Sequence, residues 1–157
     1  MMATTQPLPA GPSVQLRRLF DATRDRVFSA WTERDRVAEW LCRAPAFRTE
    51  HLQFDARPGG RYLIRNTTPG GDVHTAEGEF REVAPPARLS FTWGGITKRA
   101  AGGPTEELRD TLVVVEFFER GKQTEVVLTH YGLPTDALRN NHAKGWKICF
   151  DGLEAVL

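Results

Sequence analysis

The chain of 157 residues carries 21 basic and 20 acidic side chains, and this net charge of +1 is spread along the sequence rather than gathered in blocks. The balance excludes the basic footprint of a nucleic-acid-binding protein, and no run reaches the roughly 18 apolar residues of a membrane span. A chain of this length can bury about 70% of its unfolded surface, so we expect one domain that needs neither a structural metal nor a disulfide.

Residues 1–13 hold three prolines and small polar residues, and we expect them to form a disordered tail. They lack the apolar segment of a secretory signal, and the two cysteines, Cys42 and Cys149, lie far apart in the sequence. We therefore expect reduced thiols, a cytoplasmic location and a single domain over residues 14–157.

In the first half of that domain, the spacing of apolar residues changes from strand-like to helical and then back to strand-like. Residues 14–20 alternate between apolar and polar side chains, which predicts a strand, and the helical spacing of apolar residues over 27–41 predicts two short helices. From about His51 the pattern predicts strands separated by glycine-rich or proline-rich turns. These segments are 61–66, 73–83, 88–93, 112–119 and 124–131. The thirteen residues 95–107 are expected to form a long glycine-rich loop, either a binding lid or a mobile tip.

The last segment, residues 135–157, predicts a long amphipathic helix. Thr135 and Asp136 suit a helix start, and eight side chains share an arc of roughly 120°. Gly145 and Gly152 lie on one flank, where we expect a neighbouring element to approach closely. The eight are Leu138, His142, Trp146, Cys149, Phe150, Leu153, Val156 and Leu157. The predicted order is a strand, two helices, several antiparallel strands and a final helix. This order is typical of an α+β domain.

Five segments in this order resemble the START-like superfamily, also called SRPBCC or birch-pollen-allergen-like: 27–40, 55–62, 78–93, 124–133 and 142–146. Within it, they are similar to the branch named after the activator of the ninety-kilodalton heat-shock chaperone ATPase. The resemblance implies a helix-grip fold, in which a curved antiparallel sheet of about six or seven strands wraps around the C-terminal helix and leaves a cavity. This fold hosts lipid carriers, cyclases and co-chaperone domains, so function depends on the site.

Two histidines are candidates for that cavity. His142 lies on the apolar arc of the helix. It is either a structural residue hydrogen-bonded to a backbone carbonyl or a strand side chain, or a functional one that anchors a ligand carbonyl or hydroxyl or shuttles a proton. His130 shares a strand face with Val126 and Leu128 and is expected to look the same way. The other histidines, His51 and His74, sit on distant segments, so we expect no metal site and no cofactor.

The aromatic residues complete the predicted ligand set. Trp93 ends its strand beside the glycine-rich loop, which makes it the best candidate for the cavity rim. Core packing alone explains large aromatic side chains, because burying each contributes about 1.5–3 kcal/mol. The predicted ligand-binding residues are Tyr62, Phe91, Trp93, His130, His142 and Trp146.

Other reactive groups carry weaker signals. Glu77 and Glu79 share a strand face and could act as acid and base, but a solvated face is the more common role of such a pair. Cys149 has no basic neighbour in sequence except His142, two turns away, and is better explained as a small core residue than as a nucleophile. We expect no catalytic residue.

Three functions remain open. The first is binding of a small hydrophobic molecule between sheet and helix. The second, implied by the resemblance, is partnership with the heat-shock chaperone in a stress response, although the eukaryotic activators carry an additional N-terminal domain for much of that contact. The third is a cyclase or hydrolase that uses His142 or His130 as general base. Ile148, on the polar side of the helix, suggests a partner surface, and the oligomeric state stays open.

Overall fold

The computed structural model describes residues 8–9 and 11–157. Most of the predicted disordered tail therefore lies outside the described residues, and the first strand begins at Ser13. The elements in chain order are β1 (Ser13–Phe20), α1 (Arg24–Thr32), α2 (Arg34–Val37), β2 (Arg48–Phe54), β3 (Arg61–Thr67), β4 (Val73–Ala84), β5 (Arg88–Lys98), β6 (Glu106–Arg120), β7 (Gln123–Tyr131) and α3 (Asp136–Val156).

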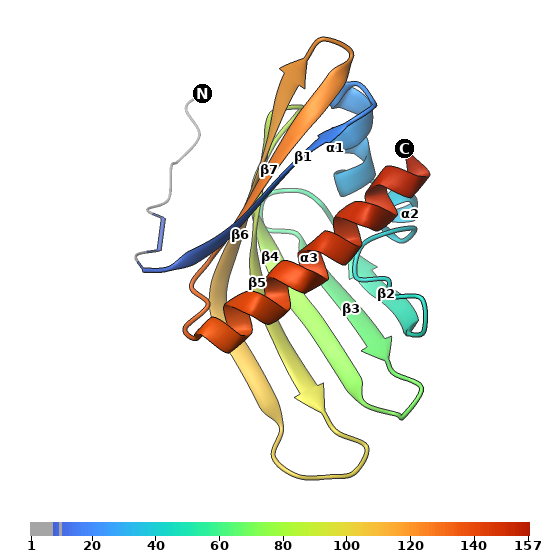
Figure 1. Ribbon diagram of the computed structural model, residues 1–157, viewed down its shortest axis with the longest axis vertical. Coiled ribbons are helices and arrows are strands. Elements are labelled where there is room, and N and C mark those ends of the chain that lie inside the picture. The colour runs from blue at the N-terminus through green and yellow to red at the C-terminus, as the bar shows by residue number, and fades with distance from the viewer. Residues whose placement is uncertain (1–7, 10) are drawn as a thin grey trace.

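The seven strands form one antiparallel sheet in the order β1-β7-β6-β5-β4-β3-β2. Consecutive strands from β2 to β7 are neighbours, while α1 and α2 connect the two edge strands β1 and β2. The helix α3 crosses one face of the sheet, and its C-terminal end lies beside α1 and α2 (Figure 1). This arrangement confirms the predicted α+β helix-grip fold. The sheet has seven strands where about six or seven were expected, and two short helices follow the first strand.

The helix α3 begins where the sequence indicated. The Thr135 hydroxyl accepts a hydrogen bond from the Leu138 backbone N–H at 3.1 Å, which is an N-cap interaction. Trp146, Phe150 and Leu153 are buried against the core, whereas the side chains of the first two turns are at least partly exposed. The N-terminal half of α3 is thus less covered by the sheet than the C-terminal half.

An aromatic cluster fills the space under the C-terminal half of α3. The rings of Trp31 and Trp40 meet edge to face at 4.6 Å, and Phe20 meets Phe150 at 5.6 Å. The Trp40 indole N–H donates to the Ala30 carbonyl at 2.9 Å, so this buried polar group is satisfied. Edge-to-face packing of such large side chains closes this end of the molecule.

The sheet bends at irregularities in β4 and β5. Register shifts occur between Phe80 and Glu82 and between Trp93 and Gly95. Such bulges increase the local twist and redirect side chains. Gly78 is required here, because a Cβ at that position would lie 1.9 Å from the Thr92 carbonyl oxygen. The bend brings Trp93 toward α3.

Two expectations from the sequence need correction. The predicted loop over 95–107 is shorter, because β5 continues to Lys98 and β6 begins at Glu106, with Thr97 paired to Glu106. Two β-branched residues, Ile96 and Thr97, favour this extension of the strand. Gly145 has no close neighbour either, since an added Cβ would meet nothing within 4 Å, whereas at Gly152 it would meet Trp40 at 3.5 Å.

Candidate functional site

A pocket of about 320 Å³ opens between residues 141–149 of α3, the sheet and the segment that follows α2. The aromatic cluster continues from Trp31 through Trp146 to Trp93, and the space beyond these last two rings stays unfilled. Its lining residues are Cys42, Arg43, Ala44, Phe47, Asn66, Trp93, Asn141, His142, Gly145, Trp146, Ile148 and Cys149.

Two indole rings form the inner wall of the pocket. Trp93 from β5 and Trp146 from α3 lie with their ring centroids 5.0 Å apart and their planes inclined by 53°. Trp146 is buried and Trp93 is half-buried, so Trp93 offers the larger exposed ring surface. Such rings provide apolar contact area at low entropic cost, which suits binding of an apolar or aromatic ligand.

The position of Trp146 is fixed by a buried hydrogen-bond chain. Its indole N–H donates to Nδ1 of His130 at 3.1 Å, and Nε2 of His130 lies 2.9 Å from the Thr111 hydroxyl. That hydroxyl in turn donates to the Trp93 carbonyl. Because an indole nitrogen only donates, Nδ1 must be the acceptor, and Nε2 must carry the proton that it gives to Thr111. The chain therefore requires neutral His130.

Burial explains why this imidazole stays neutral. His130 is fully buried, and desolvation, together with the nearby His142, lowers its pKa from the usual value to about 3. It lies behind the rings of Trp93 and Trp146 and is not among the residues that line the pocket. Both ring nitrogens are already bonded, so His130 has no lone pair to offer a substrate as general base.

His142 lies at the pocket surface. Its Nδ1 donates to the Leu138 carbonyl one turn earlier at 2.9 Å, which leaves the Nε2 lone pair of the neutral ring for another donor. Among the described residues Nε2 has no hydrogen-bond partner. Burial lowers the pKa of His142, so the neutral form with its acceptor nitrogen prevails near neutral pH. Nδ1 therefore holds the ring in place, and Nε2 is left to accept a hydrogen bond at the pocket.

The remaining two predicted ligand residues, Tyr62 and Phe91, belong to the packed core. The Tyr62 hydroxyl donates to the Thr92 carbonyl at 2.6 Å, and burial raises its pKa. Together with Trp31, Leu41, Phe54 and Phe80 they line a void of only about 10 Å³. Such a void has room for no more than a single water molecule. Of the six predicted residues, Trp93, His142 and Trp146 line the pocket.

Residues 42–47 form a side of the pocket that was not predicted from the sequence. No periodic pattern marks this segment, which connects α2 to β2. Its one signal is Phe47, an exposed large apolar residue whose ring stacks on His74 at 6.3 Å. On α3, Asn141 and Gly145 flank the apolar arc next to His142, so a helical wheel could have identified them as lining residues.

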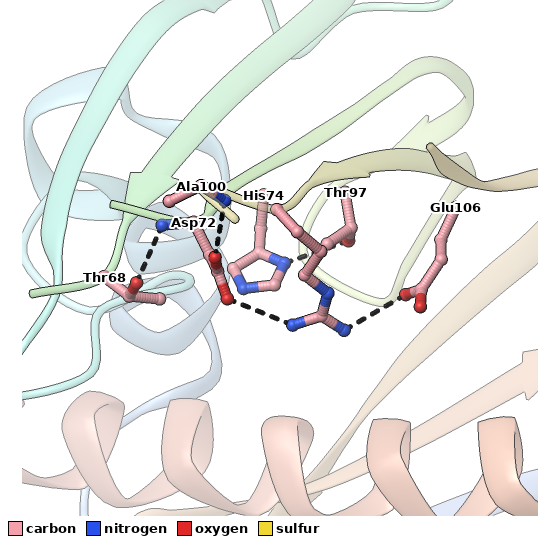
Figure 2. A network of polar contacts seen from close by, with 7 residues as sticks. Thr68, Asp72, His74, Thr97, Ala100 and Glu106 are labelled. Atoms are coloured by element: carbon pink, nitrogen blue, oxygen red, sulfur yellow. Dashed lines mark hydrogen bonds and ion pairs between the residues drawn. The ribbon is translucent and has the colours of Figure 1, made fainter. Parts of the chain in front are cut away.

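A second hollow of about 390 Å³ continues from the pocket toward the ends of β4, β5 and β6. It shares Cys42, Asn66, Trp93, Asn141 and His142 with the first. Its far side is polar, and Figure 2 shows the network of hydrogen bonds and ion pairs there. The pocket therefore has an apolar inner wall and a polar outer end.

Arg99 is the centre of that network. Its guanidinium contacts Asp72 at 3.1 Å and Glu106 at 3.2 Å, and the Ala100 backbone N–H donates to Asp72 at 2.9 Å. The Ala100 bond and Arg99 together lower the pKa of Asp72. His74 adds a bond to the Thr97 hydroxyl at 2.9 Å. These contacts hold the β3–β4 and β5–β6 connections together.

Of the other chemical candidates, Cys149 lines the pocket, whereas Glu77 and Glu79 do not. Glu77 is exposed, and Glu79 pairs with Arg61 at 3.8 Å and Arg81 at 3.7 Å. Within the described part of the chain, no three His, Cys, Asp or Glu residues are grouped as metal ligands. No helix of that part is long and apolar enough to cross a membrane.

The curved sheet, the long helix lying across it and the pocket between them define a START-like protein of the helix-grip class. The chain belongs to the family described as Activator of Hsp90 ATPase homolog 1-like protein, whose sequence model matches residues 21–157. No curated protein matches the chain.

Solved structures are similar in fold. Protein CV1439 from Chromobacterium violaceum has a TM-score of 0.76 at 22% identity, over 94% of this chain and 98% of that one. Protein Ms6760 from Mycobacterium smegmatis gives 0.75 at 21%, over 92% and 90%. The AHSA1 protein from Silicibacter pomeroyi gives 0.74 at 20%, over 92% and 96%. At these identities the likeness concerns the fold.

Proposed function

We propose that the protein binds a small hydrophobic molecule between the sheet and α3. The observation that carries this proposal is the pocket of about 320 Å³, which combines an indole wall with one unbonded imidazole nitrogen. Its volume lies at the lower end of the range for small-molecule sites, about 300–1,000 Å³. The family and its fold support a ligand-binding role of this kind.

The pocket also indicates the chemistry of the ligand. An apolar or aromatic body would contact Trp93 and Trp146, and a hydroxyl or amide N–H would donate to Nε2 of His142. A hydrogen bond of this type contributes about 0.5–1.5 kcal/mol, so it orients the ligand more than it sets the affinity. Most of the affinity would come from apolar area removed from water.

Titration with the fluorescent apolar probe 1-anilinonaphthalene-8-sulfonate tests the proposal. Its emission should rise on mixing with the folded protein, and Gly145→Leu should weaken binding about tenfold or more, because the new side chain occupies the pocket. Lys144→Leu places the same side chain on the same helix outside the pocket lining and is the matched control. Equal binding by both variants would exclude this pocket as the site.

A second candidate is partnership with the ninety-kilodalton heat-shock chaperone in a stress response. The observation in its favour is the family match over residues 21–157. Ile148, 45% exposed at the pocket edge, offers a contact point. This candidate predicts capture of the chaperone in a pull-down and stimulation of its ATPase, both weakened by Ile148→Asp.

An enzymatic role ranks third. His130 is bonded at both nitrogens, which leaves His142 as the general base. The Nδ1 of His142 bonds a backbone carbonyl rather than a carboxylate, so no carboxylate of the described residues is hydrogen-bonded to the ring to stabilise its protonated form. The free thiols Cys42 and Cys149 suit the expected cytoplasmic location, where disulfides are uncommon.

A further inference from the structure

Two thiols from distant parts of the chain meet at the pocket wall. The backbone N–H of Cys42 donates to Sγ of Cys149 at 3.4 Å, across 107 positions of sequence. Both cysteines are free, and both line the pocket. Binding of an apolar ligand does not require a pair of thiols, so this pair calls for its own explanation.

The backbone around Cys42 is held in place. Its φ of 62° lies in the left-handed region, which residues other than glycine seldom adopt. The Asn66 side-chain amide donates to the Cys42 carbonyl at 2.8 Å, and His51 bonds the preceding carbonyl of Leu41 at 3.2 Å. These bonds fix the segment after α2 so that the Cys42 N–H points at α3.

The geometry permits a covalent link. The Cα of Cys42 is one bond from its nitrogen and therefore lies within about 5 Å of the Cys149 sulfur. Disulfides join residues whose Cα atoms are about 5.5–6 Å apart. The contact therefore places the two residues in the range where a disulfide can form.

The two sulfurs also differ in reactivity. The pKa of Cys149 is lowered because the Cys42 thiol and the Cys42 backbone N–H both donate to its sulfur. The same interaction, together with burial, raises the pKa of Cys42. The backbone N–H that points at the Cys149 sulfur at 3.4 Å stabilises its thiolate, so we assign Cys149 as the attacking sulfur and Cys42 as the resolving one.

We propose that Cys42 and Cys149 form a dithiol that hydroperoxides oxidise to an intramolecular disulfide. The Cys149 thiolate attacks one peroxide oxygen, the O–O bond breaks, and with a proton the other oxygen leaves as water. The resulting sulfenic acid is attacked by Cys42, so that an S–S bond forms, the S–O bond breaks and a second water leaves with the Cys42 proton. Two thiols are oxidised by two electrons, and one hydrogen peroxide is reduced to two waters.

The link would connect two walls of the pocket. Residues 42–47 supply one wall, and α3 supplies the wall that carries Cys149. Oxidation therefore fixes the distance between them. Both cysteines line the pocket, through which a small peroxide would approach them, although Cys149 is only 5% exposed.

The test treats the full-length folded chain with hydrogen peroxide and follows intact mass and peptide maps. The expected product has lost two hydrogen atoms and contains a peptide pair linked through residues 42 and 149, formed about tenfold faster than in denaturant. Cys42→Ser should stop at one added oxygen on Cys149, trapped by dimedone. In Cys149→Ser, Cys42 should react with hydrogen peroxide no faster than a cysteine in an unfolded peptide does.

Three results would overturn the proposal. One is the absence of the 42–149 peptide pair, and another is linkage no faster than in denaturant. The third is a Cys149→Ser protein whose Cys42 reacts at the wild-type rate. The first two measurements use the wild-type chain, so they decide the question even where a serine variant, checked by far-UV circular dichroism, fails to fold.

Discussion

The imidazole of His130 joins two strands to the C-terminal helix. It accepts from the Trp146 indole and donates to Thr111, which donates to the Trp93 carbonyl. Both tryptophans of the pocket wall are therefore positioned by one buried residue that does not itself line the pocket. Each link of such a chain is costly to leave unsatisfied, about 1–3 kcal/mol per buried group.

Neutral His130 predicts a pH-dependent stability. Its pKa is about 3 in the folded protein and the usual 6.5 when unfolded, so the unfolded state binds the extra proton below about pH 6.5. The stabilisation is complete above that pH and is lost as pH falls, at about 1.4 kcal/mol for each pH unit. Urea unfolding of the wild type between about pH 7 and 5, above most carboxyl titration, should show this slope.

His130→Gln is the matched control, because an amide can accept from Trp146 and donate to Thr111 but does not titrate. The burial of His51 and His142 also lowers their pKa, so they add to the slope in both proteins. The difference between wild type and variant isolates His130. An unchanged slope in the variant would mean that His130 is not held neutral.

The sequence could show which histidines face inward but not what each nitrogen does. Helical and strand periodicity placed His142 and His130 near the cavity. The bonds of His130 depend on Thr111 of β6 and Trp146 of α3, and that proximity follows from strand register and helix placement. Local patterns do not encode such contacts. For the same reason the sequence could not show that Tyr62 and Phe91 belong to the packed core while Trp93 lines the pocket.

At the scale of elements, α3 combines a buried half with an open half. Trp146, Phe150 and Leu153 anchor it to the sheet, whereas His142 and Gly145 face the pocket. The sequence predicted the start of the helix and its apolar arc, because capping and periodicity are local signals. It could not show where the sheet departs from the helix, since this depends on the bulges in β4 and β5.

Two glycine substitutions test whether the α3 flank at Gly145 is open and whether β4 is tightly packed at Gly78. Gly145→Ala should raise the free energy of unfolding by about 0.5–1 kcal/mol, because the methyl group meets nothing within 4 Å and alanine favours the helix. Gly78→Ala should lower it by several kcal/mol, since the new Cβ would overlap the Thr92 carbonyl. Urea denaturation of both variants provides the measurement. A destabilised Gly145→Ala protein would show that this flank of α3 is packed.

At the scale of the whole molecule, a packed region and an open pocket lie next to each other along α3. The cluster around Trp31 and Trp40 fills the space beside α1 and α2, and the pocket lies against the middle of α3. The fold could be predicted from five sequence segments in order. The segment over 42–47, which completes the pocket, has no periodic pattern, so its role became visible only in three dimensions.

Native mass spectrometry of gently purified protein, compared with its denatured mass, tests the ligand-binding account most directly. The account predicts a discrete extra mass on the folded wild type that disappears on denaturation and is reduced in Gly145→Leu but not in Lys144→Leu. Its mass and fragments would identify the molecule that the pocket holds. Folded protein at the bare chain mass, or an adduct retained equally by both variants, would contradict the account.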